Sequence, residues 1–300
     1  MQYIVPIIPY DYAALQRVIR EIRQRYPFLR TQIFGKSVCG RCLTALTLGS
    51  GNDCVLFAAA FHGQEWITSY IALKFLSRLC HMEENNMHWR AKAVSKILMS
   101  RRVVIIPTIN PDGVNIALHG AESAGSYALC VNKVSGGSLH DWNANARGVD
   151  LNHNFNAGWY TLREIERGAG VCSPSPRRYG GAYPESEPET RALTNLTMCE
   201  NPNRVFAMHS QGEEIYWEYG GIKPDGAKRL ALSLAAESGY KLIKNSGLAS
   251  HGGYKDWFIK EFCRPGFTLE FGKGQNPLPL RHFESIYEKA EDMLLLAALG

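Results

Sequence analysis

The sequence lacks the features that mark nucleic-acid-binding and membrane proteins. No block of Lys or Arg exceeds three residues and the net charge is only +5, so there is no basic footprint for a nucleic acid. No apolar run approaches the length that spans a bilayer. The apolar start, residues 1–9, contains two prolines and is too short and too uncharged for a signal peptide. These absences predict a cytoplasmic protein, released at most on lysis, with no nucleic-acid or membrane partner.

The chain also has no internal repeat, no low-complexity segment, no linker and no second cysteine pair. Its eight cysteines are scattered, and the one C-x-x-C, Cys39 and Cys42, has no redox or zinc-ribbon context, so we interpret it as two thiols in a hairpin turning at Gly40-Arg41. A composition that is 45% hydrophobic and 20% charged is typical of globular proteins. The alternation of strand and helix patterns predicts one domain over residues 1–300, with a mixed or parallel sheet flanked by helices.

One stretch that is present organises the rest of the chain. The apolar run 54–61 follows a polar turn and is typical of a buried parallel strand. It ends in His62, Gly63 and Glu65, which therefore lie where open α/β sheets place ligand sites. Imidazole and carboxylate suit zinc. The bare H-x-x-E pattern is weak, and a chance match on the surface is the alternative.

Periodicity predicts the other elements. Strands are expected at 31–34, 43–48, 103–109, 203–208 and 267–272, and helices at 11–26, 66–81, 186–199, 224–238 and 279–299. Asp11 and Ser186 are the expected helix caps. Residues 110–113 (Asn-Pro-Asp-Gly) are interpreted as a turn, and 116–146, 161–183 and 248–257 as loops.

Two further strands carry residues that can act with His62 and Glu65. His209 follows the strand 203–208, and Glu270 lies near the exit of the strand 267–272. If these strands are neighbours in a parallel sheet, His62, Glu65 and His209 form a His₂Glu set that leaves a fourth position for water, as a catalytic zinc site requires. Glu270 is then the candidate to move the proton. A core histidine bonded to backbone is the alternative for His209.

These residues lie in a series of motifs that resembles the zinc carboxypeptidase (M14) family. The motifs run in the family's order from about Tyr10 to the end: H-x-x-E at 62–65, NPDG at 110–113, GVDLN at 148–152, YGG at 179–181, SEPET at 186–190, His209, and TLEFG at 268–272. The resemblance implies an α/β/α sandwich around a mixed, mostly parallel eight-stranded sheet. It also implies one Zn²⁺ per chain held by His62, Glu65 and His209, with Glu270 as the general base.

Three positions depart from the family's usual pattern. The Asn-Arg pair that grips a terminal carboxylate is Asn152-His153 here, and His lacks the bidentate fork of Arg. The basic residue that polarises the scissile carbonyl is absent: Asn143 stands about there, and Arg147 is the nearest guanidinium. The Leu248 region replaces a tyrosine, and Tyr254 is the expected substitute.

Together with the segment HSQGEEIYW (209–217), these departures resemble the bacterial γ-D-glutamyl-diaminopimelate peptidases. The resemblance implies hydrolysis of the γ-D-glutamyl–meso-diaminopimelate amide in a peptidoglycan-derived peptide, with no obligate protein partner. Glu213 or Glu214 could meet the amine of diaminopimelate, and Arg147, His153 or backbone groups its carboxylate. Ser210 is a further candidate substrate contact. A solvated acidic turn is the alternative for the two glutamates.

Three other functions remain open at this point. A general metallocarboxypeptidase would remove simple C-terminal residues, which the missing arginine disfavours. A zinc amidase or deacylase would use the same chemistry on another acyl group. A catalytically inactive binding protein would need a broken ligand set, whereas His62, Glu65, His209 and Glu270 are all present.

Overall fold

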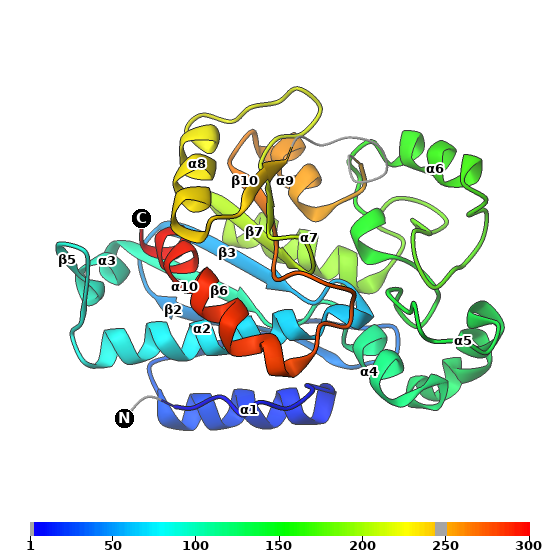
Figure 1. Cartoon of the computed structure of the whole chain (residues 1–300), viewed down its shortest axis with the longest axis horizontal. Helices are drawn as coiled ribbons and strands as arrows, with labels where there is room; N and C mark the ends of the chain where they lie inside the picture. The colour runs from blue at the N-terminus through cyan, green and yellow to red at the C-terminus, as the bar shows by residue number, and fades with distance from the viewer. Residues whose placement is uncertain (1–2, 244–250) are drawn as a thin grey trace.

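An eight-stranded mixed sheet forms the centre of the computed structural model, which describes residues 3–243 and 251–300 (Figure 1). The strand order is β1-β2-β6-β3-β7-β10-β8-β9. Their bounds are β1 Arg30–Lys36, β2 Cys42–Gly49, β3 Asp53–Ala59, β6 Arg101–Ile106, β7 Arg204–His209, β8 Glu214–Tyr216, β9 Lys241–Ile243 and β10 Gly266–Glu270; the short strands β4 (His88–Trp89) and β5 (Lys92–Ala93) pair separately. The central strands β6, β3, β7 and β10 are mutually parallel. The predicted mixed, mostly parallel eight-stranded sheet is confirmed.

Helices cover both faces of this sheet because its central strands are apolar on both sides. In β3, Val55 and Phe57 point into one core while Leu56 and Ala58 point into the other, as the two-residue period of a strand requires. The first core is closed by α1 (Tyr12–Arg25), α2 (Ile67–Glu84), α3 (Val94–Ser100), α8 (Ala227–Ser238) and α10 (Phe283–Leu299), and the second by α7 (Pro188–Glu200) and α9 (Tyr254–Phe262). The result is the α/β/α sandwich that the family resemblance implied.

The strands and long helices predicted from periodicity are present with small changes at their ends. β1 and β2 form the expected antiparallel hairpin around Gly40-Arg41. Asp11 caps α1 as predicted, since its Oδ1 accepts a hydrogen bond from the Ala14 amide at 2.8 Å. In residues 3–243 and 251–300, no helix is both long enough and apolar enough to cross a membrane.

The segment 110–146 corrects the sequence interpretation. Asn110-Pro111-Asp112-Gly113 is the start of α4 (Pro111–His119) and not a free turn: Asn110 Oδ1 accepts from the Gly113 amide at 2.8 Å, and Pro111 takes the first helical position. A 3₁₀ helix (Ala121–Tyr127) and α5 (Ala128–Ser135) follow where a loop was expected. These short helices gather around a small core that includes Val131 and Trp142, so tertiary packing outweighs their weak periodicity.

Three more local expectations were wrong. Residues 161–183 were expected to be loop, but α6 covers Trp159–Gly168. The segment 248–257 becomes helix α9 from Tyr254, while 248–250 lie outside the described residues. Helix α7 is capped by Glu187, and Ser186 instead donates its hydroxyl to the Glu187 carboxylate at 2.9 Å. Figure 1 shows α4 and α5 near each other at the lower right of the view and α6 apart from them at the upper right.

The buried Glu189 predicts a pH dependence of stability. Its carboxylate is fully buried at the start of α7 and accepts from the Val38 amide at 2.9 Å. Burial, then the charge of Asp112, raises the pKa of Glu189 to about 8. The folded state therefore binds a proton that the unfolded state releases near its ordinary pKa, and the free energy of unfolding falls as the pH rises through this window.

We expect Glu189→Gln to remove that slope. Between about pH 5 and 8 the free energy of unfolding of the wild type should fall relative to the variant, by up to about 1.4 kcal/mol per pH unit. Urea denaturation of both proteins at four pH values measures the difference. If the free energy of unfolding changes with pH in the same way in the wild type and the variant, the pKa of Glu189 is not raised in the folded protein.

Candidate metal centre and active site

The carboxyl ends of three neighbouring parallel strands bring the candidate site residues together. β7 lies between β3 and β10. His209, the last residue of β7, pairs in register with Glu270, the last residue of β10. His62 follows β3, and all three residues line one pocket. The convergence predicted from the sequence is therefore present.

In the turn after β3, the backbone at Gly63 packs closely against the backbone at Gly113 and Trp142. A β carbon added to Gly63 would lie 2.5 Å from the Gly113 carbonyl oxygen and 2.6 Å from that of Trp142, so only glycine fits. The Gly63 amide donates to the Asn143 carbonyl at 3.1 Å. This contact places His62 and Glu65, which lies in a 3₁₀ turn (Gly63–Glu65), over the end of the strand.

Asn110 ties this turn to two other segments. Besides capping α4, its side-chain NH₂ donates to the Phe61 carbonyl at 3.0 Å and to the Asn143 carbonyl at 3.1 Å, and the residue is fully buried. One side chain thus fixes the exit of β3, the start of α4 and the wall that carries Asn143. These contacts give a structural reason for the asparagine of the NPDG motif.

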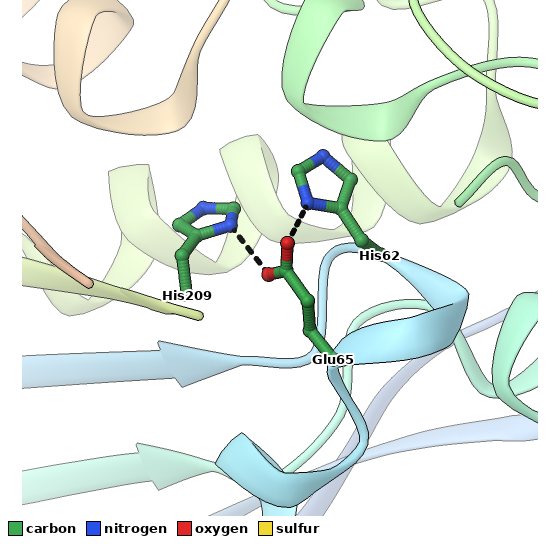
Figure 2. A group of neighbouring side chains, drawn as sticks. All are labelled: His62, Glu65 and His209. Atoms are coloured by element: carbon green, nitrogen blue, oxygen red, sulfur yellow. Dashed lines mark hydrogen bonds and ion pairs between the residues drawn. The ribbon is translucent and has the colours of Figure 1, made fainter. Parts of the chain in front are cut away.

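His62, Glu65 and His209 form a cluster whose ligand atoms all lie within 4.8 Å of one another. His62 Nδ1 is 2.8 Å from Glu65 Oε1, and His209 Nδ1 is 3.0 Å from Glu65 Oε2 (Figure 2). Figure 2 shows the two imidazole rings facing the carboxylate from opposite sides, with His62 and Glu65 on the same turn. Two imidazoles and one carboxylate are the donor set of catalytic zinc sites.

The electrostatics of the cluster fit a cation. Burial alone would raise the pKa of Glu65, but the charges of His62 and His209 lower it to about 2, so the carboxylate is ionised. His209 is buried, and its Nε2 has no hydrogen-bond partner among the described residues. A buried polar ring without a full set of partners is unusual unless it serves a site. These residues fit a zinc ion.

Asp150 supports the cluster from behind and was not singled out from the sequence, although it lies within the GVDLN motif. Its Oδ1 is 3.1 Å from His62 Nε2, and its Oδ2 accepts from the Arg178 amide at 2.9 Å. Burial opposes ionisation, but the charges of His153 and His62 hold the pKa of Asp150 well below its usual range. A carboxylate on the second nitrogen of a metal-binding histidine fixes the ring and its tautomer.

We expect Asp150→Asn to weaken zinc binding by about 10- to 100-fold, because the amide cannot hold His62 in the same charged contact. Competition with a chromogenic chelator measures the zinc Kd. Asp225→Asn, at an exposed position on another face, is the matched control and should bind zinc as the wild type does. Unchanged affinity in Asp150→Asn would mean that Asp150 has no part in positioning His62.

Glu270 lines the same pocket as the three donors and lies on the strand next to His209. Burial, then the charge of Glu65, raises the pKa of Glu270 well above its usual value. Glu270 is thus a carboxylate that takes up a proton more readily than an exposed one. This property suits general acid–base chemistry.

The pocket has a volume of about 330 Å³ and holds four of the eight substrate contacts expected from the sequence. Asn143, Asn152, His153 and Ser210 all line it. The Asn152 side-chain oxygen accepts from the Tyr254 amide at 3.1 Å, so its NH₂ group is the part available to a ligand. His153 Nδ1 is 2.8 Å from Glu166 Oε1, which leaves Nε2 for the pocket.

The environment of His153 favours its charged form. Burial lowers its pKa, but the charges of Asp150 and Glu166 raise it above the ordinary value. Glu166 is itself held by Arg163 and by the Gly180 amide of the YGG motif at 3.2 Å. His153 therefore offers one ring nitrogen where the family usually has a bidentate arginine.

Four expected substrate contacts lie outside the pocket lining. Tyr254 is fully buried, and its hydroxyl is 2.8 Å from Thr197 Oγ1 in the core. Arg147 faces Glu187 at 3.7 Å, and Glu213 contacts Lys273 at 2.9 Å. Glu214 accepts from the Tyr216 hydroxyl at 2.9 Å and acts only through its charge, which raises the pKa of Glu270.

Other residues take those places and were missed. The guanidinium groups in the pocket belong to Arg177 and Arg178, and the pocket also contains a buried cation and anion, Lys255 and Asp256. The remaining lining residues not singled out are Asp150, Gln211, Tyr216, His251, Gly253, Thr268 and Asn276. The sequence offered one signal, a Lys-Asp pair beside the apolar Trp257-Phe258-Ile259, where charged side chains are costly to bury.

Comparisons with known proteins agree with this geometry. The family profile described as "Zinc carboxypeptidase" matches residues 15–295. The γ-D-glutamyl-L-diamino acid endopeptidase 1 of Lysinibacillus sphaericus is 35% identical over 288 residues, covering 95% of this chain and 71% of that protein. Carboxypeptidase B2 of Rattus norvegicus is 26% identical over 82% of this chain and 55% of its own length. The crystal structure of a carboxypeptidase A from Helicoverpa armigera superposes with a TM-score of 0.73 at 18% identity, covering 97% of this chain and 73% of that one.

Proposed function

Since the chain belongs to the zinc carboxypeptidase family and is a zinc metallopeptidase, we propose a specific bond that it cleaves. This bond is the amide between the γ-carboxyl of D-glutamate and meso-diaminopimelate in peptidoglycan-derived peptides. The observation that carries this proposal is the 35% identity, over 95% of the chain, to a relative named for the γ-D-glutamyl-L-diamino acid bond. The substitution of the family's carboxylate-gripping arginine by His153 supports it. The peptide is the partner; neither a protein partner nor a nucleic acid is part of the proposal.

We propose that one zinc ion per chain is held by His62, Glu65 and His209. When bound, zinc supplies Lewis-acid chemistry, which acidifies water and polarises a carbonyl. Glu270 takes the proton from the attacking water and passes it to the departing amine of the diamino acid. Its raised pKa suits both steps, since it accepts the proton readily and holds it until the amine leaves.

The other pocket residues position the peptide. Asn143 can donate its side-chain NH₂ to the oxygen of the scissile carbonyl, where negative charge develops. Asn152 and His153 meet the α-carboxylate of the diamino acid, and the raised pKa of His153 favours this contact. Arg177 and Arg178 line the same pocket and suit the free α-carboxylate of the γ-linked D-glutamate.

A general metallocarboxypeptidase is the second candidate. It is favoured by the 26% identity to carboxypeptidase B2 and by the two arginines of the pocket, either of which could grip a C-terminal carboxylate. The two candidates differ in the bond that is cut. Only the first needs a γ-linked glutamate before the scissile amide.

A paired hydrolysis assay on zinc-loaded protein tests the proposal. One substrate is L-Ala-γ-D-Glu-meso-diaminopimelate, and the other is a blocked dipeptide with a free C-terminal Phe or Lys. We expect release of diaminopimelate from the first and no cleavage of the second, with all activity lost after chelation. Cleavage of the dipeptide alone would replace the proposal with the general carboxypeptidase.

A further inference from the structure

The loop that follows β10 carries one side chain into the metal centre. Residues 271–279 form this loop, and the Gly212 amide, just beyond β7, donates to the Gly272 carbonyl at 2.7 Å. Leu278, which is only 1% exposed, anchors the other end of the loop in the core. Asn276 lies between these two anchors and lines the pocket. The loop therefore holds the Asn276 side chain at a fixed place beside the metal donors.

Asn276 is tied to Ser210, the residue after the metal donor His209. The Ser210 hydroxyl donates to Asn276 Oδ1 at 2.9 Å, and Asn276 Nδ2 donates to the Ser210 carbonyl oxygen at 2.5 Å. These two bonds fix the direction in which the amide points. A flipped amide would place its oxygen against the Ser210 carbonyl and the Glu65 carboxylate, both of which only accept hydrogen bonds. The NH₂ group of Asn276 therefore faces Glu65.

The Glu65 carboxylate receives two neutral donors in addition to the two imidazoles of Figure 2. Asn276 Nδ2 lies 3.5 Å from Oε1, the oxygen that faces His62. The Ser210 amide donates at 3.3 Å to Oε2, the oxygen that faces His209. Both distances are long for hydrogen bonds, so the two N–H groups act on the anion mainly through their dipoles. A carboxylate contacted in this way on both oxygens is held against rotation.

Holding the loop in place does not explain why Asn276 faces Glu65. The Gly272 contact and the buried Leu278 anchor the loop on both sides of Asn276. A side chain that only joined the loop to Ser210 would need no more than the two Ser210 bonds, whereas Asn276 also reaches a metal donor. The adjacent amide, Gln275, is exposed and does not line the pocket. Of these two neighbouring amides, only Asn276 is placed to act on the metal centre.

We propose that Asn276 is a positioning residue of the metal centre, which presents the Glu65 carboxylate to zinc in one orientation and is itself oriented by Ser210. This assignment rests on the proposed zinc site and not on which peptide bond is cut. Without such a partner, the ligand must be ordered at the moment when the metal binds, and hydrogen-bond partners of metal ligands account for about 10- to 100-fold in metal affinity. The Ser210 hydroxyl, a candidate substrate contact in the sequence, serves this amide instead.

Asn276→Ala tests the assignment through metal affinity. Competition between the zinc-loaded protein and a chromogenic chelator should give a zinc Kd about 10- to 100-fold above that of the wild type. Gln275→Ala is the matched control, because it removes the neighbouring exposed amide of the same loop. Its zinc Kd should equal that of the wild type.

Thermal melting separates positioning from a general loss of stability. Zinc stabilises the folded state to an extent set by the ratio of free zinc to Kd. At one free zinc concentration, the increase in Tm on addition of zinc should therefore be smaller in Asn276→Ala than in the wild type. A substitution that only weakened the loop would lower Tm equally with and without zinc.

Ser210→Ala tests whether the hydroxyl acts through the amide. Loss of this one hydrogen bond should raise the zinc Kd by about 3- to 10-fold. The double variant with Asn276→Ala should have the Kd of Asn276→Ala alone, because the hydroxyl then has no amide to orient. The visible spectrum of the Co²⁺-substituted protein, which depends on ligand geometry, should change in both single variants and not in Gln275→Ala.

The outcomes distinguish this inference from the proposed function. If wild-type protein binds no zinc, the proposed metal site fails. If the wild type binds zinc but Asn276→Ala keeps both its Kd and its Co²⁺ spectrum, or loses Tm equally with and without zinc, the residue is structural and the inference is overturned. Additive effects of the two substitutions would overturn the link between Ser210 and Asn276. The paired hydrolysis assay tests the substrate separately, so its result leaves the metal measurements unaffected.

Discussion

Glu270→Gln should retain zinc and lose at least about 10³-fold in kcat on the γ-D-glutamyl peptide, because general acid–base catalysis commonly contributes 10²–10⁴-fold. The amide keeps the shape of Glu270 but cannot take a proton from water or deliver one to the leaving amine. Glu270 is not one of the three clustered metal donors, so zinc content should stay that of the wild type. Steady-state kinetics together with metal analysis of the same samples measure both quantities.

Glu200→Gln is the matched control for this substitution. Glu200 is a carboxylate at the end of α7, paired with Arg102 and remote from the pocket lining. It should leave kcat, KM and zinc content unchanged. Full activity of Glu270→Gln would contradict the role of Glu270, and loss of zinc from it would place Glu270 among the metal ligands.

Glu65→Gln should remove both zinc binding and turnover. The Glu65 carboxylate contacts both histidines, at 2.8 and 3.0 Å, and its low pKa shows that the fold holds it as an anion. Glutamine has no charge and presents one oxygen where the carboxylate presents two. We expect less than about a tenth of the wild-type zinc content after dialysis, because zinc binds the ionised carboxylate of glutamate and the neutral glutamine amide cannot replace it.

Thermal melting gives an independent measurement of the same loss. Zinc that binds only the folded state increases the free energy of unfolding by RT ln(1 + [L]/Kd), where [L] is the free zinc concentration, and therefore raises Tm. Wild-type protein stripped by chelation should therefore gain Tm on addition of zinc, whereas Glu65→Gln should not. If the variant keeps one zinc per chain and its zinc-dependent Tm increase, another group supplies the third ligand.

The metal donors were predictable from the sequence because each follows a long apolar run. A strand that is buried on both faces, such as 54–61, is recognised by its continuous run of apolar residues. The carboxyl ends of neighbouring parallel strands lie at the same edge of the sheet. His62, Glu65, His209 and Glu270 therefore needed no side-chain detail to be placed together. The number of strands followed from the family resemblance, but their order in the sheet was not predicted, because periodicity alone does not order strands.

The substrate contacts were less predictable because they depend on where single side chains point. Tyr254 lies between two residues of the pocket lining, Gly253 and Lys255, yet its own hydroxyl contacts Thr197 in the core. Arg147 was chosen as the nearest guanidinium along the chain, while Arg177 and Arg178 are nearer in space. Lys255 was hidden in a stretch interpreted as loop, because the glycines before α9 mask the start of the helix.

Short helices were missed for a related reason. Helix α4 begins with Asn-Pro-Asp-Gly, a tetrapeptide that also suits a turn, and only the buried contacts of Asn110 decide between the two. α5 has too few residues for a clear period. α6 buries Trp159, Leu162, Arg163 and Glu166 at helical spacing, but two of these are charged, so its apolar pattern is weak. Local sequence is a weak guide where tertiary contacts supply most of the stability.

The order of the central strands also governs when the enzyme first becomes active during its synthesis. His62 and Glu65 leave the ribosome early, but His209 follows Glu65 by 144 positions and Glu270 follows later still. β7 must pair with β3, and β10 with β7, before the four residues meet, and such long-range pairings form late because the intervening chain must first be made and closed. We therefore expect no peptidase activity from a nascent chain before Glu270 has been added. A fragment that ends before β7 holds only two of the three metal donors and no proton carrier.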